Sequence, residues 1–293
     1  MKLAFIGFGE AAQAMALGFR EEGGVDEVLA YDIRVDDPLQ ATSLRDRAAE
    51  LRVTLADTLS EAVEGVPLVL STVQGSAAVA VARSVAPLLQ PGQVLVDLNS
   101  VSPDVKKSVA AAVAAGGAGG CIEGAIMDAV RPKRQKVPIL LAGPGAADAA
   151  RLLNGIGMKI EVIGDEVGQA CAVKMIRSVM IKGVEALILE SMRAAETAGV
   201  TERILSSVNV TFEGLDWHQL TSHYLRRTHE HGPRRVSEMK EAAETIRSLG
   251  LEPVMSEAIS KTIADGYGRL SGVPYDPKET YPEMLKVLAT KNT

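Results

Sequence analysis

The first half of the chain alternates short apolar, β-branched runs with alanine-rich segments whose apolar residues recur at helical spacing. This alternation is typical of parallel βαβ units. It predicts strands at residues 2–7, 27–32, 52–56, 68–72, 93–98, 121–126, 138–143 and 159–164. Helices are expected between most of these strands. The low-complexity stretch at residues 109–120 is interpreted as a helix that runs into a glycine cap.

The strand pattern stops after Gly164. Residues 165–200 contain no proline, and their apolar stripe has helical spacing up to Gly199, a suitable C-terminal cap. Roughly 30 helical residues at 1.5 Å each make a rod of about 45 Å, long enough to pass from one domain into the core of another. Further helices are expected at residues 201–210, 218–227, 234–249 and 255–270.

The expected fold class is therefore α/β, with an N-terminal, mostly parallel sheet domain and an all-α C-terminal domain. Residues 1–164 are predicted to form the sheet domain, and residues 165–293 the helical domain. The long helix is expected to join the two.

Composition excludes several classes of protein. The 293 residues are 47% hydrophobic but only 3% aromatic, which describes a globular protein with an aliphatic core. A formal net charge of -6 argues against a general nucleic-acid binder, which needs a basic face. No stretch has the roughly 20 strongly apolar residues of a membrane span, and strand-like residues beginning at Lys2 leave no room for a signal peptide. Two distant cysteines, Cys121 and Cys171, favour a reducing cytoplasm.

A glycine motif follows the first predicted strand directly, with Gly7, Gly9 and Ala12 in the spacing G-x-G-x-x-A. Between a strand and a helix, this spacing is a dinucleotide-binding fingerprint. The first glycine makes the turn, the second admits the pyrophosphate to the backbone, and the small third residue lets helix and strand pack. The unpaired N–H groups of the helix then hold the phosphates. The predicted cofactor contacts are Gly7, Phe8, Gly9, Glu10, Ala11 and Ala12; an ordinary tight turn is the alternative.

Two charged residues after the second predicted strand bear on the choice of cofactor. Asp32 ends that strand, where a carboxylate accepts hydrogen bonds from the ribose hydroxyls of NAD and repels the 2′-phosphate of NADP. Arg34 favours NADP, because a guanidinium there can reach the phosphate. The sequence predicts NAD or NADP, with NAD slightly favoured. A surface acid that only closes a strand is the alternative for Asp32.

Two further motifs accompany the glycines: "DLNSVSP" at residues 97–103 follows a strand, and "GQACAVKMIRS" at residues 168–178 opens the long helix. Together with "GFGEAA" they resemble the β-hydroxyacid dehydrogenase superfamily, which includes 3-hydroxyisobutyrate dehydrogenase and 6-phosphogluconate dehydrogenase. The resemblance covers roughly residues 1–200. It implies a Rossmann domain, a helical second domain, and hydride transfer between a hydroxy acid and a nicotinamide.

The resemblance also implies roles for individual residues. The lysine of the long helix is the family's acid/base, and here it is Lys174. Partial desolvation and a nearby cationic nicotinamide lower the pKa of such a lysine, which suits proton transfer. Asn99 and Ser100 match the loop that binds the substrate's acid group and approaches the nicotinamide. Val73 and Gln74 match the lining of its ribose, where only the Val73 backbone is a predicted contact, and Thr72 before them is a further predicted cofactor contact. The alternatives are a lysine that extends from a packed helix to solvent, and a plain loop turn.

Two departures from the family pattern concern the substrate. Met127 and Asp128 replace the family's serine and glycine in the loop after the sixth strand, so Asp128 is a candidate to meet a polyol or an amine. Ser178 replaces the asparagine one turn after the lysine, with Arg177 before it. Residues four apart share a helix face, so Ser178 is still expected to line the pocket beside Lys174, with a different substrate geometry.

The segment "YLRRTHEHGPRRVSEMKEAAE" at residues 224–244 does not resemble 3-hydroxyisobutyrate dehydrogenase. It resembles the C-terminal domain of an uncharacterised bacterial branch of the superfamily. His231, Arg234 and Arg235, near an expected helix start, are candidates to bind a substrate carboxylate or phosphate. Solvated or interface arginines are the alternative. His229 and His231 have no acid or cysteine at ligand spacing, so no metal site is expected.

The sequence thus predicts a cytoplasmic NAD(P)-dependent dehydrogenase that acts on a small hydroxy acid. One alternative is an imine or carbonyl reductase on the same scaffold, a kind of enzyme that generally lacks the lysine. The other is a nucleotide-sensing protein that has lost its catalysis. The apolar long helix predicts a homodimer, and no nucleic-acid or membrane partner is expected.

Overall fold

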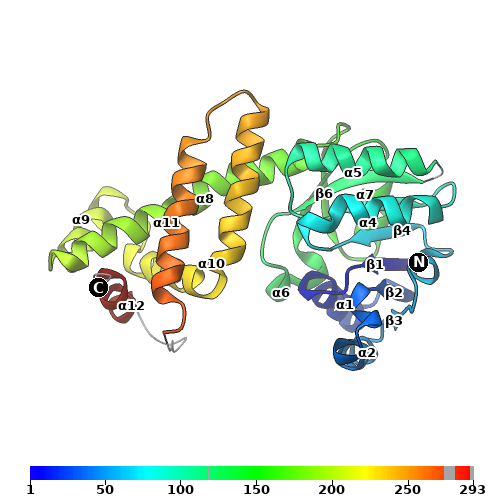
Figure 1. Cartoon of the computed structure of the whole chain (residues 1–293), viewed down its shortest axis with the longest axis horizontal. Coiled ribbons are helices and arrows are strands. Elements are labelled where there is room, and N and C mark those ends of the chain that lie inside the picture. The colour runs from blue at the N-terminus through cyan, green and yellow to red at the C-terminus, as the bar shows by residue number, and fades with distance from the viewer. Residues whose placement is uncertain (118, 274–280, 291–293) are drawn as a thin grey trace. The chain divides into compact units, whose positions relative to one another are not determined.

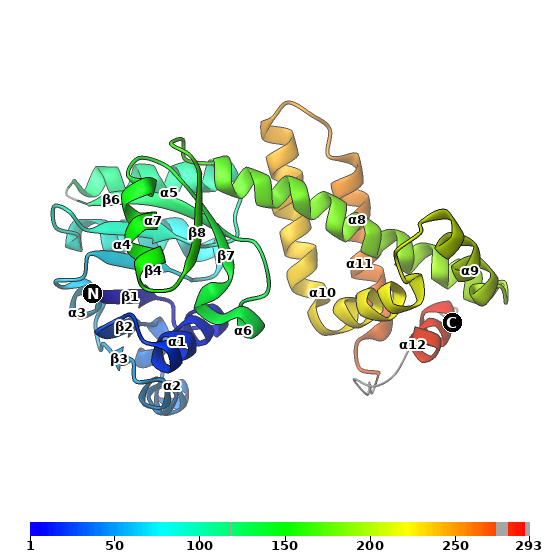
Figure 2. The same ribbon diagram turned by 180° about the vertical axis from the view of Figure 1, so that it is seen from behind.

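The computed structural model describes residues 1–117, 119–273 and 281–290. The chain divides into two compact units, with the division between Lys174 and Met175. Figures 1 and 2 show the sheet of the N-terminal unit and the helices of the C-terminal unit from opposite sides. The long helix α8 (Gln169–Thr197) begins in the first unit and continues in the second. The predicted domain boundary after residue 164 stays a prediction.

An eight-stranded sheet forms the centre of the N-terminal unit, in the order β3-β2-β1-β4-β5-β6-β7-β8. Neighbouring strands run parallel except β6 and β7, which are antiparallel. All the predicted strands are present, and the mostly parallel α/β fold class is confirmed. The strands are β1 (Lys2–Ile6), β2 (Glu27–Tyr31), β3 (Thr54–Leu55), β4 (Leu68–Ser71), β5 (Val94–Asp97), β6 (Gly120–Ile126), β7 (Pro138–Ala142) and β8 (Lys159–Gly164).

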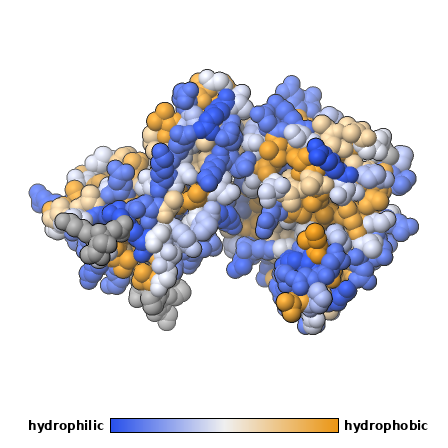
Figure 3. Space-filling view, viewed as in Figure 1, coloured by the Kyte–Doolittle hydropathy of each residue, from blue (hydrophilic) through white to orange (hydrophobic). Residues whose placement is uncertain are grey.

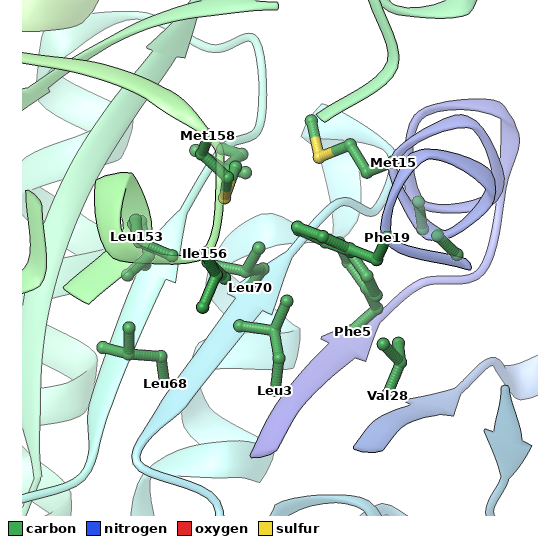
Figure 4. Close-up of a cluster of buried hydrophobic side chains, with 14 of the residues drawn as sticks. Leu3, Phe5, Met15, Phe19, Val28, Leu68, Leu70, Leu153, Ile156 and Met158 are labelled. Atoms are coloured by element: carbon green, nitrogen blue, oxygen red, sulfur yellow. The ribbon is translucent and has the colours of Figure 1, made fainter. Parts of the chain in front are cut away.

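Helices cover both faces of this sheet. One face packs against α1 (Glu10–Glu22), α2 (Pro38–Leu51) and α7 (Ala146–Gly155), and the other against α3 (Leu59–Val63), α4 (Ala78–Val85) and α5 (Pro103–Gly116). Side chains alternate along a strand, so Leu3 and Phe5 of β1 enter the first core while Ala4 and Ile6 enter the second. Figure 4 shows the first core, where Leu3 and Phe5 lie close to Phe19 of α1. A strand buried on both faces explains the continuous apolar run of β1.

Local signals set several helix ends. The Asp37 carboxylate accepts a hydrogen bond from Leu39 N–H at 3.0 Å and caps α2. Thr58 and Glu61 form a capping box at the start of α3. α5 is followed by Gly117 with φ 103°, as the predicted glycine cap requires.

The described part of the C-terminal unit is helical. After α8 come α9 (Thr201–Thr211), α10 (Trp217–Ser248), α11 (Val254–Leu270) and α12 (Tyr281–Ala289). Their apolar faces share a core that includes Met192, Leu225, Met239, Ile263 and Leu285. Hydrophilic side chains cover much of α10 and α11 in Figure 3, as expected for helices that bury one face. None of the described helices is both long and apolar enough to cross a membrane.

α10 is a single helix where the sequence predicts two, at residues 218–227 and 234–249. Pro233 lies inside it, and a proline lacks the N–H that would bond to the preceding turn, so a break is the usual result. The neighbouring Gly232 allows close packing, because a side chain there would come within 2.5 Å of Tyr267 on α11. Packing against α11 therefore keeps both segments in one helix, which bends along its length (Figure 2).

Candidate functional site

The turn after β1 and the loop after β4 meet at the carboxyl edge of the sheet, where the strand order reverses. Gly7 has φ +89°, and a side chain there would approach the Thr72 carbonyl oxygen to 2.7 Å, so only glycine fits. Thr72 Oγ1 donates a hydrogen bond to the Gly7 carbonyl at 2.7 Å and ties the two loops together. Val73 packs against Gly7 from the same loop. Ligands of open α/β sheets bind at such a reversal.

Packing does not explain the second glycine of the motif. A side chain at Gly9 would meet no described atom within 4 Å, so this position is open to an approaching ligand. Gly9 precedes α1, whose first turn holds Glu10 and Ala11, and no side chain among the described residues caps that turn. Its N–H groups are oriented to bind an anion. Ala12 is buried against the sheet, whereas the Phe8 ring lies in the core, so Phe8 offers only its backbone.

Asp32 and Arg34 hold each other in a two-point ion pair after β2. Arg34 donates from Nε to Asp32 Oδ1 and from Nη2 to Asp32 Oδ2, both at 2.8 Å. The Arg34 backbone N–H donates to Oδ1 at 3.0 Å, and the Phe8 N–H donates to Oδ2 at 2.8 Å. Burial raises the pKa of Asp32, but these hydrogen bonds outweigh burial and hold the pKa below its ordinary value. The carboxylate predicted to accept ribose hydroxyls is already fully hydrogen-bonded.

Asn99, after β5, lies in a buried polar cluster. Its Nδ2 donates to Ser71 Oγ at 3.0 Å and to Asp97 Oδ1 at 2.6 Å. Lys106 of α5 is buried in the same cluster, where its Nζ lies 3.0 Å from Asp97 Oδ2. Asn99 Oδ1 is buried without a hydrogen-bond partner among the described residues. The amide donors of Asn99 are therefore used inside the loop, and its predicted contact with a substrate stays a prediction.

Lys174 Nζ donates a hydrogen bond to Ser100 Oγ. Lys174 lies in the second turn of α8, and Ser100 is exposed on the loop after β5. The structure thus brings the predicted acid/base together with one of the two predicted loop residues. An amine in contact with a hydroxyl, at the edge of the sheet that carries the glycine turn, is suited to proton transfer.

Glu123, a residue the sequence analysis does not single out, anchors the start of α8. It is buried in β6, and its carboxylate accepts hydrogen bonds from the N–H groups of Gly168 at 2.7 Å, Ala170 at 2.8 Å and Cys171 at 3.3 Å. A carboxylate at a helix N-terminus satisfies the unpaired N–H groups and interacts favourably with the helix dipole. Glu123 therefore fixes the first turn of α8 against the sheet, just before Lys174.

Met127 and Asp128 follow β6. Met127 packs partly against a small cluster of Ala125, Ala142 and Ala170. Asp128 forms an ion pair with Lys133 and accepts a hydrogen bond from Ala129 N–H at 2.7 Å. The predicted contact of Met127 and Asp128 with a substrate stays a prediction.

Ser178 lies one turn after Lys174 on α8, and Arg177 beside it is exposed. The Ser178 Oγ accepts a hydrogen bond at 3.3 Å from Lys182, a further turn along. Lys182 is only 7% exposed, and its Nζ lies 2.9 Å from Glu238 of α10. Burial lowers the pKa of Lys182, an effect that Glu238 opposes.

Arg234 and Arg235 lie inside α10, so the predicted position near a helix start is wrong. Arg235 is buried and donates from Nε to Glu185 at 2.8 Å and also from Nη2, while Thr228 donates to the same carboxylate at 2.6 Å. A substrate anion would have to compete with this buried carboxylate for Arg235. Arg234 is more exposed, with its Nε 3.6 Å from Glu238.

The neighbouring histidines also have contacts within the unit. His229 Nε2 lies 3.2 Å from the Val273 carbonyl oxygen, and His231 lies 3.7 Å from Glu230. In the parts of the chain that the structure describes, no three His, Cys, Asp or Glu side chains gather as a metal site.

Several charged residues escape the sequence analysis, and three of them show the signal clearly, because each stands where the apolar pattern indicates a buried position. Lys106 shares a stripe with Val109 and Val113 of α5, Glu123 interrupts an apolar strand, and Lys182 lies in the apolar long helix. A charged residue at a position where the apolar pattern predicts burial is the sequence signal for such a residue, because a buried charge needs a partner.

Two family models match parts of the chain. Residues 2–100 match the model described as NADP oxidoreductase, coenzyme F420-dependent. Residues 195–265 match a domain of unknown function, DUF1932.

Solved structures match nearly the whole chain. A conserved hypothetical protein from Sinorhizobium meliloti is 49% identical, with 99% of this chain and 96% of that chain covered and a TM-score of 0.82. A conserved protein of unknown function, described as structurally similar to 3-hydroxyacid dehydrogenases, is 31% identical over 92% of this chain and 97% of that chain, with a TM-score of 0.74. The chain belongs to the β-hydroxyacid dehydrogenase-like family.

More distant structures share the fold. The 3-hydroxyisobutyrate dehydrogenase of Mycobacterium tuberculosis is 16% identical, with 99% of both chains covered and a TM-score of 0.77. An imine reductase from Bacillus cereus is also 16% identical, with 99% of both chains covered and a TM-score of 0.61. The predicted family, its Rossmann region and its helical C-terminal region are confirmed. This family member has an oxidoreductase scaffold that hydroxyacid dehydrogenases and imine reductases share.

Proposed function

We propose that the protein is an NAD(P)-dependent dehydrogenase that oxidises a small hydroxy acid, with Lys174 as the general acid/base. The hydrogen bond between Lys174 and Ser100 is the observation that carries this proposal, because it joins an amine and a hydroxyl at the edge of the sheet that holds the glycine turn. Oxidation of an alcohol removes a hydride and a proton from the substrate. A bound nicotinamide supplies the hydride acceptor, and neutral Lys174 takes the proton from the hydroxyl.

The glycine turn supports the dinucleotide part of the proposal. Gly7 fits only as glycine, the space beside Gly9 is open, and the first turn of α1 presents its N–H groups. Residues 7–12 would hold the pyrophosphate, with Thr72 and Val73 beside the nicotinamide ribose.

The Asp32–Arg34 pair supports use of both cofactors. Because Arg34 occupies both oxygens of Asp32, the ribose hydroxyls of NAD gain no free acceptor, and the guanidinium neutralises the charge that would repel a 2′-phosphate. We propose that NADP is bound at least as tightly as NAD. Asp32 alone would favour NAD slightly, and its ion pair with Arg34 removes that preference.

The proposed substrate contacts are the hydroxyls of Ser100 and Ser178. Ser100 touches the Lys174 amine, and Ser178 lies one turn further along the same helix. Short hydroxyl side chains orient an acid group without competing as acids. Asn99 would support this loop from its buried position.

The test is the Lys174→Ala variant, assayed with a panel of 2- and 3-hydroxy acids and both cofactors. Turnover is expected to fall by a factor on the order of 10²–10⁴, the usual share of a positioned proton transfer, while cofactor affinity stays the same. Lys107→Ala, which removes an exposed lysine of α5, is the matched control and should keep full turnover. Retained turnover in Lys174→Ala would remove that residue from the mechanism.

The fold's likeness to imine reductases favours imine reduction as a second candidate. Adding cyclic imines to the same substrate panel distinguishes a hydroxy-acid dehydrogenase from an imine reductase. Turnover of imines but not of hydroxy acids would favour the imine reductase. Cofactor binding without hydride transfer to any substrate would favour the non-catalytic alternative.

We also propose a homodimer in the cytoplasm. Met180 and Leu187, two turns apart on α8, are 72% and 64% exposed, and large apolar side chains on one helix face are typical of an interface. Light scattering that showed a monomer at working concentration would contradict this.

A further inference from the structure

A small pocket lies inside the C-terminal unit, lined by residues of α8, α9 and the first turns of α10. Its volume is about 120 Å³, and none of the side chains that line it is charged. Most of the lining is apolar and includes Leu187, Ile188 and Met192 of α8, and Leu205 and Val208 of α9. None of the residues proposed to take part in catalysis lines this pocket.

Two polar groups among the lining residues have unused hydrogen-bonding capacity. Trp217 Nε1 and Thr221 Oγ1 are buried and have no hydrogen-bond partner among the described residues. The whole Thr221 side chain is buried, with 0% of the residue exposed. Trp217 and Thr221 are four residues apart on α10, so they lie on the same face of that helix. Because a buried polar group without a partner costs free energy, two of them beside one pocket indicate that a ligand supplies their acceptor.

Trp217 is held in place by contacts outside the pocket. Its backbone N–H donates a hydrogen bond to Asn209 Oδ1 at 3.0 Å, and its ring packs against the Phe212 ring with the two centroids 5.4 Å apart. Ser191, the third polar residue of the lining, donates its hydroxyl hydrogen to a backbone carbonyl of its own helix. Trp217 and Thr221 are therefore the donors that the pocket offers.

The chemistry of the lining selects the class of ligand. An indole N–H can only donate, and a carbonyl oxygen has two lone pairs with which to accept from Trp217 and Thr221. A charged ligand would be buried without an opposite charge, which is unfavourable. A cavity of about 150 Å³ holds benzene, so the smaller volume here suits a ligand of about five non-hydrogen atoms.

We infer that this pocket binds a short-chain, uncharged carbonyl compound through Trp217 and Thr221. The apolar walls pack against the hydrocarbon part of the ligand, and the two donors bind its oxygen. The inference does not rest on the proposed function, whose substrate is an anion.

The test uses two probes of matched shape, the ketone 2-butanone and the anion propanoate. Trp217 is the only tryptophan of the chain, so protein with isotopically labelled tryptophan gives a single indole N–H resonance. Titration with 2-butanone is expected to move this resonance downfield until it saturates, because the N–H gains an acceptor. The dissociation constant should be on the order of 1 mM, as suits so small a ligand. Propanoate should leave the resonance where it is.

Thr221→Val keeps the shape of the side chain and removes its hydroxyl. This variant should bind 2-butanone about fivefold more weakly, the effect of one uncharged hydrogen bond. Without ligand its melting temperature should rise, because a methyl group replaces a buried hydroxyl that has no partner in the protein. Thr262→Val is the matched control; it removes a hydroxyl of α11 that donates to the Ala258 carbonyl at 3.1 Å, and it should leave ketone binding unchanged.

A second pair of variants tests the position of the ligand. Val208→Phe fills the pocket and should abolish the shift of the indole resonance. Val210→Phe places the same ring on the same helix at a residue that is 76% exposed, and it should bind 2-butanone like the wild type. Val208→Leu replaces Val208→Phe if the larger side chain prevents folding, and it should weaken binding.

Four results would each overturn the inference: an indole resonance that does not saturate with 2-butanone, unchanged ketone binding in Thr221→Val, a lower melting temperature of that variant without ligand, or propanoate bound as tightly as the ketone. A crystal soaked in 2-butanone that held only water beside Trp217 and Thr221 would do the same. None of these measurements depends on turnover. Failure of the proposed function appears separately, as full turnover in Lys174→Ala.

Discussion

Arg34 places Nε and Nη2 each 2.8 Å from a different oxygen of Asp32, so the acid that follows β2 is one half of an ion pair. The same carboxylate accepts the Phe8 N–H from the glycine turn. The residues proposed to choose between NAD and NADP are thereby connected to the residues proposed to bind the pyrophosphate.

Replacing Arg34 with alanine is expected to shift the preference toward NAD. NADPH binding should weaken about tenfold, because a charge-assisted contact to the 2′-phosphate is lost. NADH binding should strengthen, because Asp32 becomes free to accept the ribose hydroxyls. Fluorescence titration with both reduced cofactors gives the two dissociation constants. Arg45→Ala removes a surface arginine of α2 that pairs with Asp57, and it should change neither. Equal changes in both affinities would show that Arg34 supports the turn without selecting a cofactor.

The buried Glu123 carboxylate predicts a variant that is both less stable and less active. Glu123→Ala leaves the N–H groups of Gly168, Ala170 and Cys171 without their acceptor, and the free energy of unfolding should fall by about 3 kcal/mol. Turnover should fall too, since the turn of α8 before Lys174 loses its anchor. Urea unfolding and steady-state assays measure the two effects.

The control for that experiment is Glu166→Ala, which removes an exposed acid shortly before α8 and should change stability by less than about 0.5 kcal/mol. Wild-type stability in Glu123→Ala would mean that water accepts the hydrogen bonds of these N–H groups with no loss in the free energy of unfolding.

The sequence predicts the parts of this molecule that depend on local patterns. Two-residue alternation, helical spacing and turn glycines identify the eight strands and the turn at Gly7. These features follow from the chain's immediate neighbourhood, which is why periodicity alone finds them. The meeting of Lys174 with Ser100, 74 residues away, is expected only from the family resemblance.

Pairings between distant charges cannot be obtained in this way. Glu185 lies 50 residues before Arg235, and Glu123 lies 45 before Gly168, so only the folded chain shows that they meet. The sequence marks such residues only as charges at apolar positions. The continuous α10 escapes prediction for a related reason, because packing of Gly232 against Tyr267 outweighs the local effect of Pro233.

The two cysteines are expected to be unreactive in the native protein. Burial raises the pKa of Cys121 to about 12 and raises that of Cys171 as well, with nearby acids adding to the effect. The thiolate is the reactive form, and a group below its pKa stays protonated, so both thiols remain neutral at about pH 8. Iodoacetamide should label them only after denaturation in urea, as counted by mass spectrometry. Rapid labelling of the native protein would mean that β6, which contains Cys121, or the start of α8, which contains Cys171, opens to solvent.

The buried pair of Arg235 and Glu185 predicts opposite outcomes for single and double replacement. Arg235→Met leaves Glu185 buried without its partner and should lower the free energy of unfolding by about 3–5 kcal/mol. Arg235→Met combined with Glu185→Leu removes both charges and should recover most of that loss, because two apolar side chains fill the same space. Arg193→Met breaks a partly exposed pair with Asp265 and should cost less than about 1 kcal/mol. Urea unfolding measures all three. If the double variant is stable but loses affinity for hydroxy acids, Arg235 also contributes to the substrate site; if it keeps that affinity, Arg235 serves the helical unit alone.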